Sequence, residues 1–276
     1  MYLEKAKEAL NLIKKRPFVL PIIVLVDLLF LVSYGFSRSI IQRKLAPFLQ
    51  VIIDLSSKVT SSATELFNAG GDPLQMILSD PTFTTSVVSI AKIFLVFALS
   101  IYLLWTLLQG SGWSMANKFI DKKIKLFSYV SKFALVNLFW FGLASLVIFG
   151  FMRFTLYNLF SLNNSVSAAI PNWVSIVANA IIIYFVFISI ALVTKLDFLE
   201  NIKTTFRVGF KKFPKIITTY ALIIAVIATL NLFISFLMKT SLSLGIGVGI
   251  VMVIPMLTYS RIYFMLIIEK VIKEKN

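Results

Sequence analysis

The clearest indication of the architecture is the stretch of residues 216–238, IITTYALIIAVIATLNLFISFLM. It contains no charged side chain, and a lysine lies directly before it and directly after it. At about 1.5 Å of rise per residue, a helix of this length crosses the roughly 30 Å hydrocarbon core of a bilayer. The stretch therefore predicts a transmembrane helix rather than a buried helix of a soluble domain.

Five more apolar blocks of similar length occur along the chain. Hydrophobic residues make up 59% of the 276 residues, and the mean hydropathy is +0.92. A soluble domain of this size must cover its surface with polar side chains and cannot use so many apolar ones. We therefore expect an all-α, polytopic membrane bundle that forms a single transmembrane domain over residues 1–276. The predicted spans are about 17–37, 87–109, 132–152, 173–194, 216–238 and 244–268.

The distribution of lysine and arginine predicts the orientation. Five basic residues precede the first span, five lie in 118–132, six in 195–215 and three in the C-terminal tail, whereas the opposite loops carry six in all. Basic residues favour the cytoplasmic side of a membrane protein. Both termini and the second and fourth loops are therefore expected in the cytoplasm.

Three basic amphipathic segments lead into spans on that side, at 3–16, 118–131 and 199–213. Helices of this kind lie in the membrane interface, with apolar side chains among acyl chains and lysines at lipid phosphates. Contact of these lysines with lipid phosphates explains the net charge of +15, so the charge does not indicate a nucleic-acid partner. The candidates for anionic lipid headgroups are Lys14, Lys15, Arg16, Lys122, Lys123, Lys211, Lys212 and Lys215.

The longest polar connection begins with an amphipathic segment at about 39–67, predicted to lie outside the cytoplasm. Its apolar residues fall largely on one helical stripe, and Pro47 permits only a kinked or restarted helix there. The segment is expected to lie on the membrane or cap the bundle. A role in self-association is the alternative.

Asp27 and Arg261 are the charged residues expected deep in the membrane. Each is about 12 to 15 Å along its helix from the predicted cytoplasmic end. A charge at such a depth requires a partner, so we predict that the two form an ion pair, with Lys92 as the next possible partner of Asp27. The pair is either a buried salt bridge that joins the first and last spans, or a proton- or ion-linked site.

Other polar or small residues in the spans have structural interpretations. Asn137, Asn179 and Asn231 are typical of interhelical hydrogen bonds. The run Gly245, Gly247 and Gly249 indicates close helix packing or a flexible segment. Trp113 and Trp173 are expected in an aromatic belt at the outer interface.

The composition excludes most kinds of active site. The chain has no cysteine and no histidine, which removes disulfides, thiol nucleophiles, Cys/His zinc sites and imidazole catalysis. The carboxylates predicted outside the cytoplasm are scattered and have no partner base. We therefore expect no catalytic residues, no metal site, no cofactor and no enzymatic activity.

Three elements resemble a known group of membrane proteins. They are ENIKTTFRVGFKKFP at 200–214, ALNLIKKRP at 9–17 and PMLTYSRIY at 255–263. Together they resemble six-helix prokaryotic proteins similar to the membrane domain attached to some glycerophosphodiester phosphodiesterases. The resemblance implies a six-helix membrane domain with no established activity. The soluble phosphodiesterase domain, with its metal-binding histidines and carboxylates, has no counterpart in this sequence, so its hydrolase activity is not implied.

The leading hypothesis is a non-enzymatic accessory, assembly or lipid-organising protein of a prokaryotic cell membrane. Its expected partners are anionic lipids, other membrane proteins or a second copy of the chain. The alternative is a small transporter or channel that uses the Asp27 and Arg261 pair. Flux measurements on reconstituted protein would distinguish the two.

The orientation can be tested with introduced cysteines, because the parent chain has none. Cysteines at Ser57 and Asn163 should react with a membrane-impermeant thiol reagent applied to intact cells. Cysteines at Lys123 and Lys212 should react only after the cells are permeabilised. Labelling of the second pair in intact cells would reverse the predicted orientation.

Overall fold

The computed structural model describes residues 1–68, 79–160 and 172–274, and all the secondary structure in these ranges is helical. Five of the helices found there are long and apolar enough to cross a membrane. The chain is therefore an all-α membrane protein, as the composition predicts. The five candidate spans are Val19–Leu55, Pro81–Ile120, Leu126–Phe151, Phe213–Thr240 and Leu242–Lys273.

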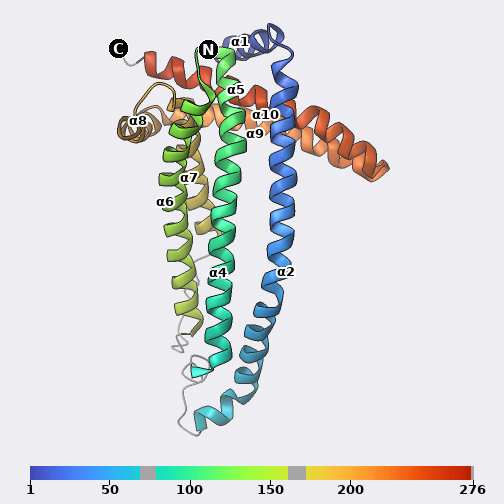
Figure 1. Ribbon diagram of the computed structural model, residues 1–276, viewed down its shortest axis with the longest axis vertical. Helices are drawn as coiled ribbons and strands as arrows, with labels where there is room; N and C mark the ends of the chain where they lie inside the picture. Colours follow the sequence, from blue (N-terminus) through green and yellow to red (C-terminus); the bar gives the residue numbers. More distant parts are fainter. Residues whose placement is uncertain (69–78, 161–171, 275–276) are drawn as a thin grey trace. The chain divides into compact units, whose positions relative to one another are not determined.

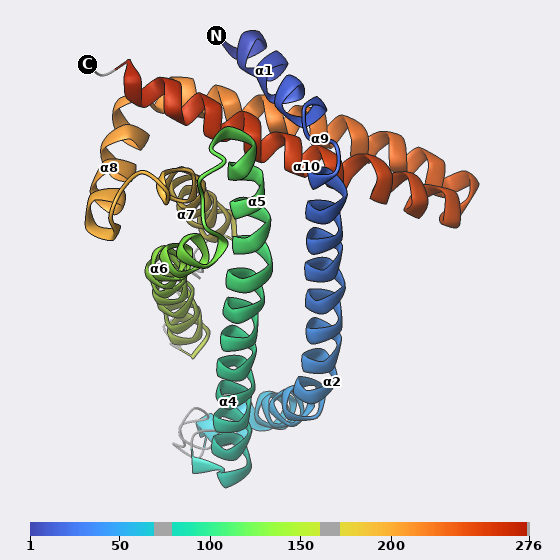
Figure 2. The ribbon, with the colours of Figure 1, turned by 45° about the horizontal axis from the view of Figure 1, so that its top comes forward.

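The first candidate span belongs to a helix much longer than predicted. Helix α2, Val19–Asn68, joins the predicted span 17–37 to the amphipathic segment 39–67 without a break. Residues 37–46 contain neither glycine nor proline, so nothing in them ends a helix. Pro47 lies inside α2, and the helix bends in its second half (Figure 2) instead of restarting. The helix therefore does not end near residue 38, and the predicted span and amphipathic segment are parts of one helix.

The second candidate span also extends past its predicted end at residue 109. Helix α4, Pro81–Leu104, continues through a π-helical turn, η1, Trp105–Gln109, into α5, Gly110–Ile120. Asp121 then has an extended backbone, and its carboxylate accepts a hydrogen bond from the Lys123 amide at 2.9 Å. This turn separates α5 from α6, Leu126–Phe160. The segment 118–131 is consequently not one amphipathic helix, which corrects the prediction.

The remaining elements are α1, Tyr2–Lys14, α7, Asn172–Leu192, α8, Phe198–Lys211, α9, Phe213–Thr240, and α10, Leu242–Lys273. The apolar part of α7, Ile176–Leu192, is shorter than the five candidate spans. The fourth membrane crossing predicted at 173–194 therefore stays a prediction.

The chain forms two compact units, and the single transmembrane domain predicted over residues 1–276 stays a prediction. The first comprises Met1–Phe30, Trp105–Phe151 and Pro171–Asn276, and the second comprises Leu31–Leu104 and Met152–Ile170. Helix α10 is central to the first unit, because residues 261–268 are all buried and the helix contacts α1, α5, α7 and α9. Around it, Trp140 of α6 stacks on Phe185 of α7, which also packs on Phe206 of α8.

Helices α9 and α10 form a hairpin whose direction the sequence does not predict. The hairpin lies across α5 and the first part of α2 rather than alongside them (Figures 1 and 2). Its turn contains Ser241, whose hydroxyl caps α10 by accepting from the Leu244 amide. Near the turn, apolar side chains such as Leu232 and Val251 are more than 70% exposed, as expected for groups that face lipid.

The three glycines of α10 have different environments. A methyl group on Gly245 would lie 3.0 Å from backbone atoms of Met238, and closer still to its side chain. A methyl group on Gly247 would meet no atom within 4 Å. The close packing predicted for the run is therefore found at Gly245, on the face toward α9.

Substitution of these glycines should give opposite results. Gly245→Ala should lower the stability of the protein in detergent by about 1–3 kcal/mol, because the α9–α10 hairpin must separate. Gly247→Ala, the matched control, should stabilise α10 by about 0.5–1 kcal/mol through helix propensity. Thermal unfolding followed by circular dichroism measures both changes. Equal effects at the two positions would contradict the packing described for the hairpin.

Candidate functional site

The predicted ion pair lies at the centre of the first unit. Arg261 of α10 donates from both terminal guanidinium nitrogens to Asp27 of α2, at 2.9 Å to Oδ2 and 2.8 Å to Oδ1. The exposed fraction of the two side chains is 9% and 2%. This bidentate geometry is the strongest that arginine and a carboxylate can form. The prediction that Asp27 and Arg261 pair is confirmed.

A third residue, Gln109, joins the pair. Its side-chain amide donates to Asp27 Oδ1 at 3.1 Å, and its oxygen accepts from Arg261 at 2.6 Å. Gln109 ends the π-helical turn η1, whose wider winding changes the direction of the side chains that follow α4. Sequence reasoning missed this residue, because it considered only charged and asparagine side chains. The signal available in the sequence was an amide side chain within an otherwise apolar span.

Two residues of α5 lie close to the charged groups of Asp27 and Arg261. A methyl group on Gly112 would lie 3.0 Å from the guanidinium of Arg261 and 3.6 Å from Asp27 Oδ1. The ring of Trp113 lies 5.7 Å from the guanidinium carbon, within range of a cation–π interaction. Trp113 is 3% exposed, so its predicted place in an outer aromatic belt was wrong. Both residues follow Gln109 on α5.

We call Asp27, Gln109 and Arg261 the polar clasp. It joins three helical segments, the start of α2, the η1–α5 segment and α10, through hydrogen bonds in which one positive and one negative charge compensate each other. Such an arrangement suits a fixed structural contact, because every oxygen of the Asp27 carboxylate already accepts a hydrogen bond.

The predicted asparagine contacts have mixed outcomes. Asn137 is buried in α6, Asn179 is partly buried in α7, and Asn231 is exposed on α9. The prediction that Asn231 lies between helices of the same chain was therefore wrong. The fully buried Asn201, which was not predicted, donates to the Ser189 carbonyl at 2.9 Å and accepts from the Ser189 hydroxyl.

Asn201 belongs to α8, a helix with three distinct faces. One face, made of Asn201, Thr205, Val208 and Gly209, is buried, and a methyl group on Gly209 would clash with Phe185 of α7. A second face carries exposed apolar side chains, with Leu199 78% and Phe210 68% exposed. The third carries the exposed basic residues Lys203, Arg207 and Lys211. The polar and small face thus fixes α8 to α7, and the apolar and basic faces stay exposed.

The basic residues predicted to contact lipid divide into two groups. Lys14, Lys15, Lys122, Lys123 and Lys211 are exposed. Arg16, Lys212 and Lys215 are partly buried. Arg16 donates to the Lys118 carbonyl at 2.6 Å, and Lys215 forms an ion pair with Glu274. Arg16 and Lys215 therefore have structural contacts that the sequence did not indicate.

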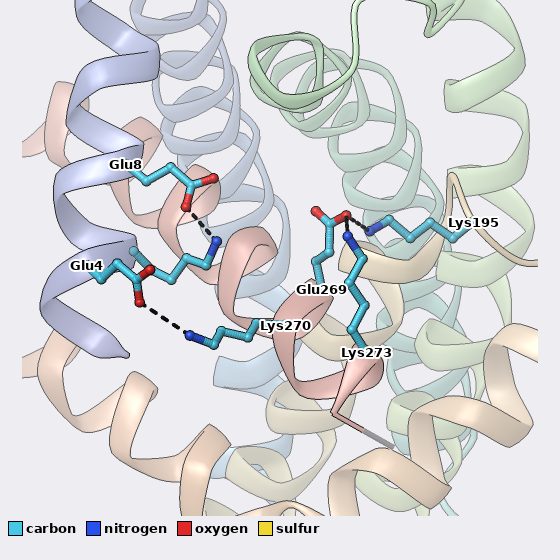
Figure 3. Close-up of polar contacts among 7 residues, drawn as sticks. Glu4, Glu8, Lys195, Glu269, Lys270 and Lys273 are labelled. Atoms are coloured by element: carbon cyan, nitrogen blue, oxygen red, sulfur yellow. Dashed lines mark hydrogen bonds and ion pairs between the residues drawn. The ribbon is translucent and has the colours of Figure 1, made fainter. Parts of the chain in front are cut away.

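Further ion pairs hold α1 and the turn that follows α7 to the end of α10 (Figure 3). Glu4 of α1 binds Lys270 at 3.3 Å, and Glu269 binds Lys195 and Lys273, each at 3.2 Å. Lys270 holds the pKa of the Glu4 carboxyl below its ordinary value. Two tyrosine hydroxyls supplement these contacts, since Tyr259 donates to the Ala6 carbonyl and Tyr2 to the Lys215 carbonyl. The acidic residues at this end are therefore engaged by lysines.

Among the described residues, no group of acidic side chains is placed to hold a metal ion. Comparison of the chain with profiles of known families, with curated proteins and with solved structures gives no match. The resemblance to the six-helix membrane domain thus stays a prediction.

The polar clasp can be tested with a double-mutant cycle. Asp27→Asn and Arg261→Gln should each destabilise the protein by roughly 3–5 kcal/mol, because each strands a buried charge, and the double variant should recover much of that loss. The exposed pair Lys132 and Asp197 provides the control, with coupling below about 1 kcal/mol. Thermal unfolding in detergent measures all the variants. Additive losses at Asp27 and Arg261 would mean that the two side chains do not interact.

Proposed function

We propose that this chain is a non-enzymatic accessory protein of a cell membrane, and that it organises anionic lipids around its basic side. The proposal depends on the exposed apolar and basic residues of helix α8. Its exposed apolar and basic faces are adjacent, which is the arrangement of a helix at the level of lipid headgroups. In this proposal both termini lie in the cytoplasm, where anionic lipids give the membrane surface a negative potential.

The attachment of α8 supports lipid binding more than a purely structural role. A helix that only stabilised the fold would bury its apolar residues. In α8, Phe206 and Val208 pack inward, but Leu199 and Phe210 are exposed. Those side chains are stable only against another apolar surface, and acyl chains supply one. Because Asn201 and Gly209 hold the helix to α7, the basic side chains would meet headgroups in a fixed arrangement.

The polar clasp favours this function over the alternative of transport. A proton or ion that used Asp27 would have to displace Arg261 or Gln109 from a carboxylate that accepts three hydrogen bonds. Breaking such a buried pair costs several kcal/mol, and the tight approach of Gly112 leaves little room beside it. We therefore assign the clasp to stability and the lipid contacts to the surface of the protein.

The proposal predicts a local effect of charge on lipid retention. The variant Arg207→Gln/Lys211→Gln should weaken binding of phosphatidylglycerol at α8 by about 30-fold, since each basic residue near the surface contributes ~1 kcal/mol. Lipids that remain with the purified protein can be counted by mass spectrometry. Arg38→Gln/Arg43→Gln removes the same charge from exposed positions of α2 and is the matched control.

The control variant should retain as much phosphatidylglycerol at α8 as the parent chain. If both double variants lose the lipid equally, the attraction is a general effect of net charge. If neither loses it, α8 does not bind anionic lipid and the proposal fails.

A further inference from the structure

A crevice lies within the second unit, between α2 and α4. Its volume is about 300 Å³, and both helices contribute to its walls. Lys44 of α2 and Lys92 of α4 both line it, although they lie far apart in the sequence. Lys92 was predicted only as the next possible partner of Asp27, and no separate role was predicted for Lys44.

The crevice has a basic end, an apolar wall and a hydroxyl end. Along α2, Ser37 precedes Lys44 by about 10 Å of helix, and along α4, Ser100 follows Lys92 by about 12 Å. The two helices run in opposite directions, so both lysines mark one end of the crevice and both serines mark the other. Between them the wall is apolar and includes Ile41, Val96 and Phe97.

The two lysines bring positive charge that the protein does not neutralise locally. Among the described residues, neither ammonium group has an ion-pair partner, whereas Glu4, Glu269 and Glu274 each engage a lysine. Two ammonium groups at one site repel each other unless an anion lies between them. The adjoining apolar wall requires that the anion carry a hydrocarbon part.

We propose that this crevice binds one anionic phospholipid of the surrounding bilayer, with its phosphate between Lys44 and Lys92 and one acyl chain along the wall toward Ser37 and Ser100. Lysine stems cover apolar surface while their ammonium groups reach the phosphate level, which suits both parts of such a lipid. The bilayer presents phospholipids to the crevice at far higher concentration than any dissolved anion. A soluble phosphate would satisfy the lysines and leave the wall uncovered.

The site is independent of the lipid surface proposed for α8. It lies in the other compact unit, and it depends on a pair of lysines and a cavity rather than on an amphipathic helix. The two sites can therefore be lost separately. The experiment below can therefore distinguish lipid binding in the crevice from lipid binding at α8.

The test uses the full chain, purified in detergent, with phosphatidylglycerol, phosphatidylcholine or oleate added at known concentration. Native mass spectrometry counts the bound molecules. Lys44→Gln/Lys92→Gln should remove one phosphatidylglycerol site, with affinity lowered about 30-fold, and should leave binding at α8 unchanged. Val96→Trp, which keeps both charges but fills the crevice, should remove the same site. Arg38→Gln/Arg43→Gln is the control for net charge on α2 and should keep it.

Thermal unfolding of each variant shows that it remains folded. The proposal is overturned if the lysine variant or Val96→Trp binds phosphatidylglycerol as the parent does, or if the control loses the same site. Equal affinity for phosphatidylcholine would show that the lysines do not recognise negative charge. Tighter binding of oleate than of phosphatidylglycerol would identify a fatty-acid site instead.

Discussion

The arrangement of the first unit depends on the contact of Asp27 with Arg261. Burying a single charge in the middle of a membrane protein costs a large free energy. This cost falls only when an opposite charge pairs with it in good geometry. The bidentate contact meets this condition, and Gln109 bonds both partners. Because α10 lies across α2 and α5, the clasp fixes one point at which three segments must converge.

The rest of the unit follows from this fixed point. Residues 261–268 of α10 are buried around it, so α1 and α7 can pack on the same helix. The ion pairs of Glu4 and Glu269 then hold the ends of these elements to α10. Asn201, together with the packing of Phe206 on Phe185, holds α8 to α7, while Leu199 and Phe210 stay exposed. Polar contacts thus supplement an apolar core, and further apolar side chains stay on the outside.

Composition and charge predicted the class of protein, because long uncharged blocks have no other stable environment than a membrane. They also predicted the Asp27 and Arg261 contact, since few charges lie at that depth and each needs a partner. Helix ends were harder to predict. The helix continues past residue 38 because a polar sequence can continue a helix, and past residue 109 because the chain passes through a π-helical turn. The direction of the α9–α10 hairpin, the role of Gln109 and the place of Lys44 and Lys92 in one crevice depend on tertiary contacts, which periodicity in one sequence does not encode.

We propose that the polar clasp is a closed structural contact rather than part of an aqueous pathway. The most direct measurement is the reactivity of a cysteine at Ser260, a small, buried residue next to Arg261, in a chain that otherwise has none. In the folded protein the variant Ser260→Cys should resist a water-soluble thiol reagent and react only after unfolding, whereas the exposed Ser128→Cys should react at once. Rapid modification of the folded Ser260→Cys variant would show that water reaches the clasp and would contradict this account.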